Sequence, residues 1–303
     1  MLRKLNVGGI RWIDGVNLKD EEIIKVLSSF DFHELDIEAC LEENQRARID
    51  SYEDYLFMVL HFPKYNKRNK VYELNEFNVF LGRDYLITFR RKTGGYVDKV
   101  FDMYSDKKLK KDEEFKLSSA FVLYEILQSM LEKMFKMTEN ITRDLKLIED
   151  RVFDKTSYSL VKEIMIKKRN IIVLKNMFVP QVSVMKLMEF KVNKLFSGEV
   201  LEYFEDLEDK ITHVVSDTKI IEEYVNSIED AFISITNINT NRVMSFLAFF
   251  SAFMLPLTFI TSFYGMNIDL PFQNNSNIIY LFLFYTSIIM VLIFVYFKKK
   301  RNI

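Results

Sequence analysis

Residues 243–264 read VMSFLAFFSAFMLPLTFITSFY, and residues 278–297 read IIYLFLFYTSIIMVLIFVYF. Neither stretch contains a charged residue, and a helix of about 20 apolar residues is long enough to cross the hydrocarbon core of a bilayer. Helices buried inside a soluble protein rarely lack charge on every face at this length. The two stretches therefore predict two membrane spans, joined by an outer loop at residues 265–277.

The basic residues that flank the spans predict the topology. Arg242 precedes the first span and KKKR follows the second at residues 298–301, whereas the loop 265–277 contains no Lys or Arg. An excess of Lys and Arg marks the cytoplasmic side of a membrane. We therefore expect a multi-pass protein of the cell (plasma) membrane with both termini in the cytoplasm.

The composition of the 303-residue chain argues against several other classes of protein. The formal net charge of −1 gives no support for a nucleic-acid partner. The lone Cys40 rules out an intramolecular disulfide, and the first twenty residues contain no apolar signal-peptide core. His33, His61 and His213 are too scattered to predict a zinc site. No pairing of a nucleophile with a base is evident, so we expect no enzyme.

Three parts follow one another along the chain. Residues 1–116 mix strand and helix signals and predict a cytosolic α/β domain, with a helix near residues 19–30. Strands are expected at Ile10–Ile13, Tyr55–His61, Phe77–Leu81 and Tyr85–Phe89. Residues 117–242 predict a helical region with breaks at Pro180 and Gly198, and residues 243–303 form the membrane part. The fold class is that of an α+β membrane protein.

A regular apolar row precedes the first span. Its members, three and four residues apart in turn, are Ile211, Val214, Thr218, Ile221, Val225, Ile228, Phe232 and Ile235. Such a seam is typical of a helix that packs along another helix or along its own copy. No Gly or Pro separates the row from the first span, so we expect one helix over about residues 200–264, roughly 95 Å long. A rod of that length with a seam on one side predicts an oligomer.

The first span carries its own row of mostly small or polar residues, which we call the pore row. Its members are Asn241, Met244, Ala248, Ser251, Leu255, Thr258 and Ser262. Small residues let helices approach closely in a membrane, so the row fits ordinary helix packing. It fits the lining of a polar pore equally well, and the residues alone leave both interpretations open.

Residues 241–267, NRVMSFLAFFSAFMLPLTFITSFYGMN, resemble the signature of the CorA-type magnesium and divalent-cation transporter (metal ion transporter) family. The first membrane helix of that family begins at an Asn, carries a Pro-Leu-Thr step and ends in Tyr-Gly-Met-Asn. Further segments are also similar to the family, namely RWIDGVN at 11–17, FHELDIEACLEENQRARIDSYEDYLFMVLHF at 32–62, FLGRDYLITF at 80–89 and YFEDLEDKI at 203–211. The resemblance covers most of the chain.

The resemblance implies a funnel-shaped homopentamer in the lipid bilayer. A cytosolic α/β domain joins a long stalk helix, the first span lines the pore, and the second spans form an outer ring. The implied substrate is Mg²⁺, with Co²⁺ and Ni²⁺ as further cargo. Mg²⁺ is also implied as the ion that regulates the channel from the cytosol.

The outer mouth of the implied pore is formed by Gly265, Met266 and Asn267. Mg²⁺ gives up its waters reluctantly, so a ring of neutral oxygens suits it better than a carboxylate ring that holds it too tightly. Five Asn267 side chains would offer amide oxygens to the hydrated ion, and the carbonyls of Gly265 and Met266 would add acceptors. Asp269 is the acid of the outer loop, and two interpretations of it stay open. It forms a ring that attracts cations to the mouth, or it is an ordinary loop residue without a role in transport.

The inner end of the implied pore narrows near the cytosol. Met244 and Leu247 are expected to form a hydrophobic gate, and Asn241 a second polar ring. Leu255 stands where the family often has Met, and Thr258 belongs to the Pro-Leu-Thr step.

Acidic residues of the stalk are implied to bind regulatory Mg²⁺ together with acids of a neighbour's α/β domain. The stalk acids are Asp206, Asp209 and, further along, Asp230, and the partner acid is Glu38. The family has a second acid where this chain has Ala39, so we expect weaker Mg²⁺ binding here. Asp36, Glu42 or Glu43 could compensate for it.

Two alternatives compete with a passive Mg²⁺ channel. The first is a Zn²⁺ or proton-coupled transporter of the same family, which would share the Gly-Met-Asn motif. The second is a membrane-anchored scaffold or enzyme, whose spans would need neither the pore row nor that motif. The sequence does not separate Mg²⁺ from Co²⁺, Ni²⁺ or Zn²⁺, because hydrated dications differ little at a ring of amides.

Overall fold

The computed structural model describes residues 1–42, 45–91, 95–106, 118–154, 157–196, 200–268, 271 and 275–301. The chain divides into two compact units, Met1–Asp230 and Ala231–Ile303. The predicted division into three parts at residues 116 and 242 stays a prediction.

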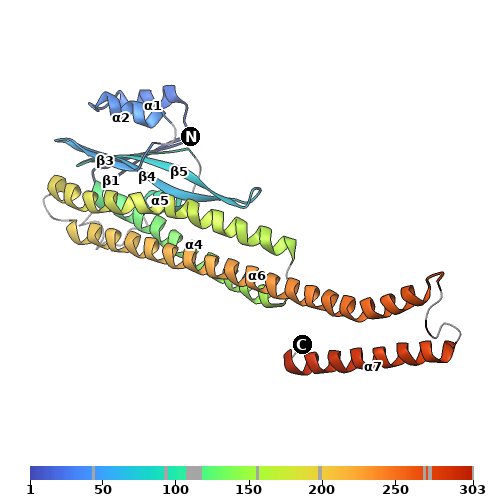
Figure 1. Ribbon diagram of the computed structural model, residues 1–303. Coiled ribbons are helices and arrows are strands. Elements are labelled where there is room, and N and C mark those ends of the chain that lie inside the picture. Colours follow the sequence, from blue (N-terminus) through green and yellow to red (C-terminus); the bar gives the residue numbers. More distant parts are fainter. Residues whose placement is uncertain are drawn as a thin grey trace. The chain divides into compact units, whose positions relative to one another are not determined.

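A six-stranded sheet forms the centre of the first unit (Figure 1). Its strands are β1 (Leu2–Val7), β2 (Ile10–Val16), β3 (Arg48–Ser51), β4 (Tyr55–Asn66), β5 (Val71–Gly82) and β6 (Tyr85–Arg90), in the spatial order β1-β2-β6-β5-β4-β3. Only β2 and β6 pair in parallel; the other neighbours are antiparallel. The four predicted strands correspond to β2, β4, β5 and β6, whereas β1 and β3 were not predicted.

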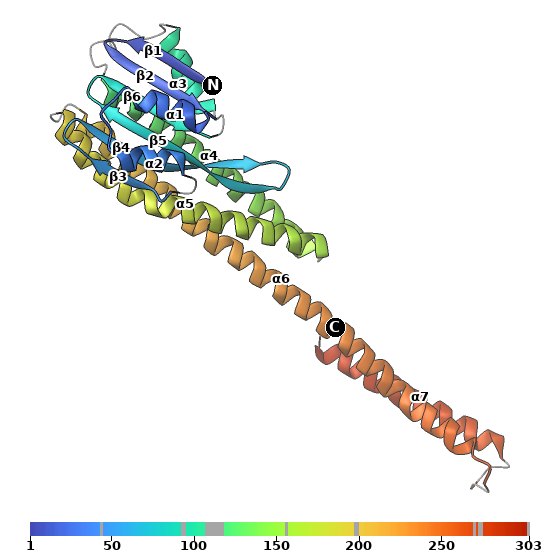
Figure 2. The same ribbon diagram turned by 90° about the horizontal axis from the view of Figure 1, so that it is seen from above.

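Helices cover both faces of this sheet. On one face, α1 (Asp20–Leu27) and α2 (Glu34–Leu41) build an apolar core with side chains of the strands; its buried members include Ile23, Leu27, Ala39, Phe57 and Phe80. On the other face, α4 (Ser119–Asp154) and α5 (Tyr158–Phe196) contact the strands, and α3 (Gly95–Ser105) contacts α4 (Figures 1 and 2). The alternation of side chains along each strand lets the two faces have separate cores.

The predicted break at Pro180 is wrong, because α5 continues through this residue. Proline removes one backbone hydrogen bond, which frees the carbonyl of Asn176 four residues earlier. Pro180 and Asn176 are both exposed, so water can satisfy that carbonyl. The helix is also fixed on both sides of Pro180 by the buried residues Phe178 and Val184. Gly198, the second predicted break, lies outside the described residues.

The stalk and the first span form one helix, α6 (Leu201–Tyr264), as predicted. Most of the predicted seam, however, is already buried against other helices of the same chain. Its first six members, Ile211 to Ile228, are at most 4% exposed, and hydrogen bonds tie this stretch of α6 to α4 and α5. The seam therefore packs on helices of its own chain, and it does not by itself require a second copy.

Three helices in the described part of the chain are long and apolar enough to cross a membrane by length and composition alone: α5, α6 and α7 (Ser276–Arg301). The apolar window of α5 is 44% buried inside the protein, whereas those of α6 and α7 are 6% and 0% buried. The apolar residues of α5 that pack on the sheet side explain why its composition resembles that of a span. The two spans predicted from the sequence lie in α6 and α7.

Candidate pore and regulatory site

The pore row lies on the face of α6 that points away from α7. The residues of this stretch that are at least half-buried are Ser245, Phe249, Phe253, Pro256, Leu257, Ile260 and Tyr264. They mark the side toward α7, since the ring of Phe249 lies 6.0 Å from that of Phe294, centroid to centroid. At 3.6 residues per turn, the pore row falls on roughly the opposite side of the helix.

Every member of the pore row is exposed within the chain. Met244, Leu247 beside the row, and Leu255 are 61%, 50% and 68% exposed. The hydroxyl of Thr258 donates to the carbonyl of Met254 at 2.9 Å, which leaves its oxygen as an acceptor on the exposed face. α7 therefore does not cover this mixed row of amide, hydroxyl, thioether and small side chains.

The end of α6 presents the Gly-Met-Asn sequence in a tight turn. The Gly265 amide donates to the carbonyls of Thr261 and Ser262 at 3.0 and 3.2 Å, and the Met266 amide donates to Phe263 at 3.3 Å. A Cβ atom on Gly265 would lie 3.1 Å from the Thr261 carbonyl oxygen, so a larger residue would be crowded there. Asn267 follows with an exposed side chain. Asp269 lies outside the described residues.

The predicted regulatory acids do not come together in one chain. Asp206 accepts hydrogen bonds from Lys210 Nζ at 2.5 Å and from the Tyr124 hydroxyl at 3.1 Å, while Asp209 and Asp230 are exposed further along α6. Burial and the bond to the Asp206 carboxylate raise the pKa of Tyr124. Glu38 is exposed on α2, on the other face of the sheet (Figure 1). Within the described ranges, no group of three or more His, Cys, Asp or Glu could hold a metal ion.

Position 39 lies in the core of the α/β domain within one chain. Ala39 is 4% exposed and belongs to the core beneath α2. Asp36, named above as a possible substitute, is 1% exposed and accepts a hydrogen bond from the Tyr55 hydroxyl at 2.8 Å. Burial raises the pKa of Asp36 despite that bond. Glu42, the second acid named for compensation, is exposed, and Glu43 lies outside the described residues.

Contacts between α6 and its neighbours were not predicted from the sequence. Lys168 and Lys175 of α5 bind Glu229 and Glu222 of α6 at 2.5 and 2.6 Å, and the Tyr224 hydroxyl of α6 bonds to Glu149 of α4. These contacts hold the stalk part of α6 to the α4–α5 pair. The spacing of charges along α6 does not predict these contacts, because the partners lie 47 to 75 residues apart in the sequence.

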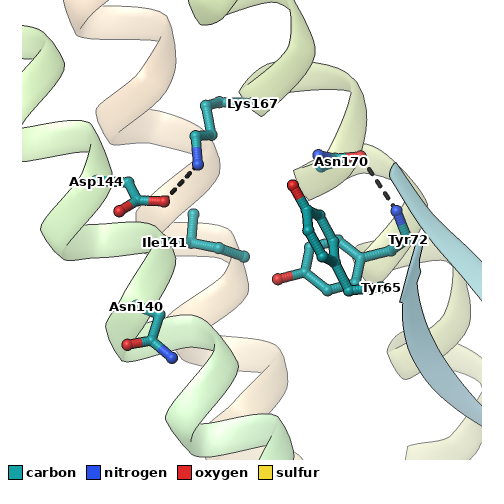
Figure 3. Close-up of a pocket in the computed structure, with 7 residues that line it drawn as sticks. All are labelled: Tyr65, Tyr72, Asn140, Ile141, Asp144, Lys167 and Asn170. Carbon is teal, nitrogen blue, oxygen red and sulfur yellow. Dashed lines mark hydrogen bonds and ion pairs between the residues drawn. The ribbon is translucent and has the colours of Figure 1, made fainter. Parts of the chain in front are cut away.

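A cavity of about 160 Å³ lies where α4 and α5 meet the end of the β4–β5 hairpin (Figure 3). Tyr65 and Tyr72 point into it from the hairpin, opposite the Asp144–Lys167 ion pair of 2.5 Å. Asn170 accepts from the Tyr72 amide at 3.3 Å and donates to the Lys70 carbonyl at 2.9 Å. Burial raises the pKa of Tyr72 to about 12. These contacts fasten the hairpin to the helices.

Comparisons with known proteins agree with this geometry. The family model described as "CorA-like Mg2+ transporter protein" matches residues 7–299. The cobalt/magnesium transport protein CorA of Thermotoga maritima is 25% identical over 96% of this chain and 82% of its own length. The solved CorA magnesium transporter of Methanocaldococcus jannaschii has a TM-score of 0.80 at 21% identity, over 96% of this chain and 90% of that one. The ZntB cytoplasmic domain from Vibrio parahaemolyticus has a TM-score of 0.63 at 13% identity, over 75% and 88%.

Proposed function

The chain belongs to the CorA-like Mg²⁺ transporter family, whose members are ion transporters or channels and not enzymes, and from this premise we propose that it is a homopentameric Mg²⁺ channel that closes when cytosolic Mg²⁺ is high. Membership makes it a divalent-cation transporter. The choice of Mg²⁺, with Co²⁺ and Ni²⁺ as further cargo, the number of subunits and the gating are proposals.

The position of the pore row carries the proposal. The row is exposed on the side of α6 opposite α7, so several copies of α6 can turn it toward a common axis while α7 stays outside. A span that served only as an anchor would need no exposed row of amide and hydroxyl groups, since such groups are costly against lipid. This favours a pore over a membrane-anchored scaffold.

The turn after α6 suits the recognition of a hydrated dication. Copies of Asn267 would present amide oxygens to the water shell of Mg²⁺, an ion that keeps several of its waters when it binds. Neutral acceptors attract the ion without holding it as tightly as carboxylates, which permits it to leave. The carbonyls of Gly265 and Met266 would add acceptors at the same mouth.

A hydrophobic gate is proposed near the cytosolic end. The side chains of Met244 and Leu247 are exposed within one chain and would meet their copies around the axis. A narrow apolar ring closes a pore by excluding water, so small rotations of α6 would suffice to open it. Asn241 would form a polar ring just inside the gate. Leu255 and Thr258 would line the wall between the gate and the mouth.

Regulation is proposed to depend on acids from two copies. Asp206 and Glu38 are on opposite faces of one sheet, so a shared Mg²⁺ requires Glu38 of a neighbouring copy. Asp209 lies one turn from Asp206 and would join the site, and Asp230 would act further along the stalk. Loss of the ion would leave like charges that repel one another and loosen the closed state.

The proposed orientation has both termini in the cytoplasm of a plasma-membrane protein. Lys298 to Arg301 support it, because the outer loop has no basic residue. The likeness to the ZntB cytoplasmic domain keeps Zn²⁺ transport as the alternative, although at 13% identity it concerns the fold alone.

Uptake by purified protein in liposomes tests the pore. Asn267→Ala should reduce Mg²⁺ uptake at least tenfold while the protein remains assembled, because the first contacts with the water shell are lost. Asn277→Ala, which removes an amide of the same kind from α7, is the matched control and should leave uptake unchanged. Normal uptake through the Asn267→Ala protein would refute the role given to this turn.

A further inference from the structure

Asp206, the stalk acid of the proposed regulatory site, has a counter-ion in its own chain. Lys210 follows one turn later on α6, and its Nζ lies 2.5 Å from Oδ2 of Asp206. An acid four residues before a lysine is the favourable order for such a pair on a helix. The side chains of Asp206 and Lys210 are 42% and 25% exposed. The pair is therefore open to solvent, and an ion that reaches Asp206 also meets Lys210.

A second donor, from α4, binds the same carboxylate oxygen. The Tyr124 hydroxyl donates to Oδ2 of Asp206 at 3.1 Å, and the ring of Tyr124 packs on that of Tyr203 with 5.0 Å between centroids. Burial and the bond to Asp206 raise the pKa of Tyr124, so its hydroxyl stays protonated and donates. A carboxylate oxygen has two lone pairs, so Oδ2 is fully used within its own chain. Mg²⁺ would have to bind through Oδ1 or replace a donor on Oδ2.

Lys210 lies in a strongly acidic stretch of the sequence. Residues 195–218 contain seven Asp or Glu, and Lys210 is their only Lys or Arg. Acids of this stretch are close enough to disfavour one another's charge. Partial burial, a hydrogen bond with Glu208 and the charges of Glu208 and Glu205 raise the pKa of Glu189 on α5. The single positive charge of the stretch is thus placed on the acid to which Mg²⁺ binding is assigned.

We propose that Lys210 is the resident counter-ion of the regulatory site and competes with Mg²⁺ for Asp206. With the ammonium on Oδ2, the carboxylate is neutralised and repels other acids less. Mg²⁺ carries two positive charges, so close binding to this carboxylate requires that the ammonium is displaced or that the two cations repel each other. The inference rests on the proposed function, since it takes Asp206 to bind the Mg²⁺ that closes the channel.

This competition raises the Mg²⁺ concentration at which the channel closes. An exposed ion pair that has to be broken costs a competing ligand about two- to fivefold in affinity. When Mg²⁺ leaves, the ammonium of Lys210 returns to Asp206 and limits the repulsion in the empty site. The competition takes place within the stalk, so it does not depend on which acid a neighbouring copy contributes.

Removal of the lysine charge tests the competition by current. Lys210→Met keeps an apolar stem and a good helix former at this position. It should lower the internal Mg²⁺ concentration that closes the channel about two- to fivefold, because Mg²⁺ then meets an unpaired Asp206. Lys167→Met, which removes the partner of Asp144 from an ion pair of the same 2.5 Å, is the matched control and should not shift closure.

Two more variants separate the charge of Lys210 from its packing. Lys210→Arg keeps a positive charge beside Asp206 and should close near the Mg²⁺ concentration of the parent. In the Asp206→Asn background, Lys210→Met should no longer lower the closing concentration, because the ammonium has no carboxylate to compete for. A lowering of the same size in that background would show that Lys210 acts on another acid and would overturn the proposal.

Chemical labelling of the unmutated full-length protein follows the displacement without any current. Acetylation of lysines by an N-hydroxysuccinimide ester is read by mass spectrometry at constant ionic strength, because salt screens exposed ion pairs. Lys210 should react slowly without Mg²⁺ and faster as Mg²⁺ is added, since the ammonium then leaves Asp206. Lys167, which is bound to Asp144, should stay slow, and Lys146, an exposed residue of α4, should stay fast.

Each outcome decides for or against the competition. Closure of Lys210→Met at the parent's Mg²⁺ concentration or above it would overturn the proposal, while regulation by Mg²⁺ would stand. Acetylation of Lys210 that does not change over the range in which Mg²⁺ closes the channel would overturn it as well. A parent current that ignores internal Mg²⁺ would overturn both the regulation and this inference, and the pore would stand if Asn267→Ala still abolished uptake.

Discussion

Glu38 and Asp206 lie on opposite faces of the six-stranded sheet, Glu38 on α2 and Asp206 on α6. Mg²⁺ binds its ligands at about 2.0–2.1 Å, so one ion cannot join these two carboxylates within a chain. If both contribute to closure, they do so across a contact between copies.

Glu38→Gln and Asp206→Asn should each raise the cytosolic Mg²⁺ concentration needed for closure by about five- to tenfold. The amide of Asn can still accept from Tyr124, so the fold around α4 is kept. The double variant should shift closure no further than the larger single shift, because both changes remove the same ion. Current recorded against internal Mg²⁺ measures this, with Asp150→Asn on α4 as the control; additive shifts would show that the two acids act at separate sites.

Ala39→Asp should destabilise the protein and should not sharpen its response to Mg²⁺. The side chain would enter the core beneath α2, where a carboxylate without a partner costs about 2 kcal/mol or more. Thermal unfolding of the purified protein should show a lower Tm than the parent. An unchanged Tm together with closure at lower Mg²⁺ would mean that position 39 faces a neighbour after all.

A buried ion network predicts how the cytosolic unit responds to acid. Arg90, 1% exposed at its side chain, binds Asp14 and Asp98 at 3.0 and 2.7 Å. Burial alone would raise the pKa of Asp98, but hydrogen bonds and charges from Arg90 and Arg3 lower it below the ordinary 3.8. The stabilisation that this pairing contributes is therefore complete above pH 3.8. It is lost as the pH falls from 3.8 through the lower pKa that Asp98 has in the folded protein.

Asp98→Asn should accordingly flatten the loss of stability in that acidic window and lower stability at neutral pH. Asp102→Asn, an exposed change on the same helix α3, is the control. Urea unfolding at a series of pH values measures both. If Asp98→Asn and the parent lose stability in parallel below pH 3.8, the network does not control the acid response.

The proposed topology predicts which residues reagents can reach from each side. A cysteine at Asn275, between the spans, should react with a membrane-impermeant maleimide added outside cells. One at Asn302 should react only after the membrane is opened, because it follows the basic tail. Labelling of Asn302 in intact cells would reverse the orientation.

Much of the fold could be predicted because its signals are local. The charge-free helical stretches of α6 and α7, the four apolar strands and the uninterrupted α6 each follow from a short stretch of sequence. β1 was not predicted because it is an edge strand with Arg3 and Lys4 in its sequence and no buried residue. Pro180 was misjudged because its helix is held by contacts with distant strands, which outweigh one missing hydrogen bond.

The candidate site was predictable only as a row of residues. The spacing of Asn241, Met244 and Thr258 places them on one face of a helix, but only the position of α7 shows that this face is left uncovered. The burial of Ala39 had no clear signal in the sequence, because α2 has a weak apolar pattern. The apolar seam of α6 correctly predicted that this helix packs along other helices. Those helices proved to be α4 and α5 of the same chain.

Ion currents through the purified protein in planar bilayers test the central claim most directly. The account predicts a Mg²⁺ current, without a proton gradient, that falls as Mg²⁺ rises on the side bearing the two termini. The current should be lost in Asn267→Ala and kept in Asn277→Ala. A protein that carries Zn²⁺ but no Mg²⁺, or that moves ions only when a proton gradient is applied, would contradict it.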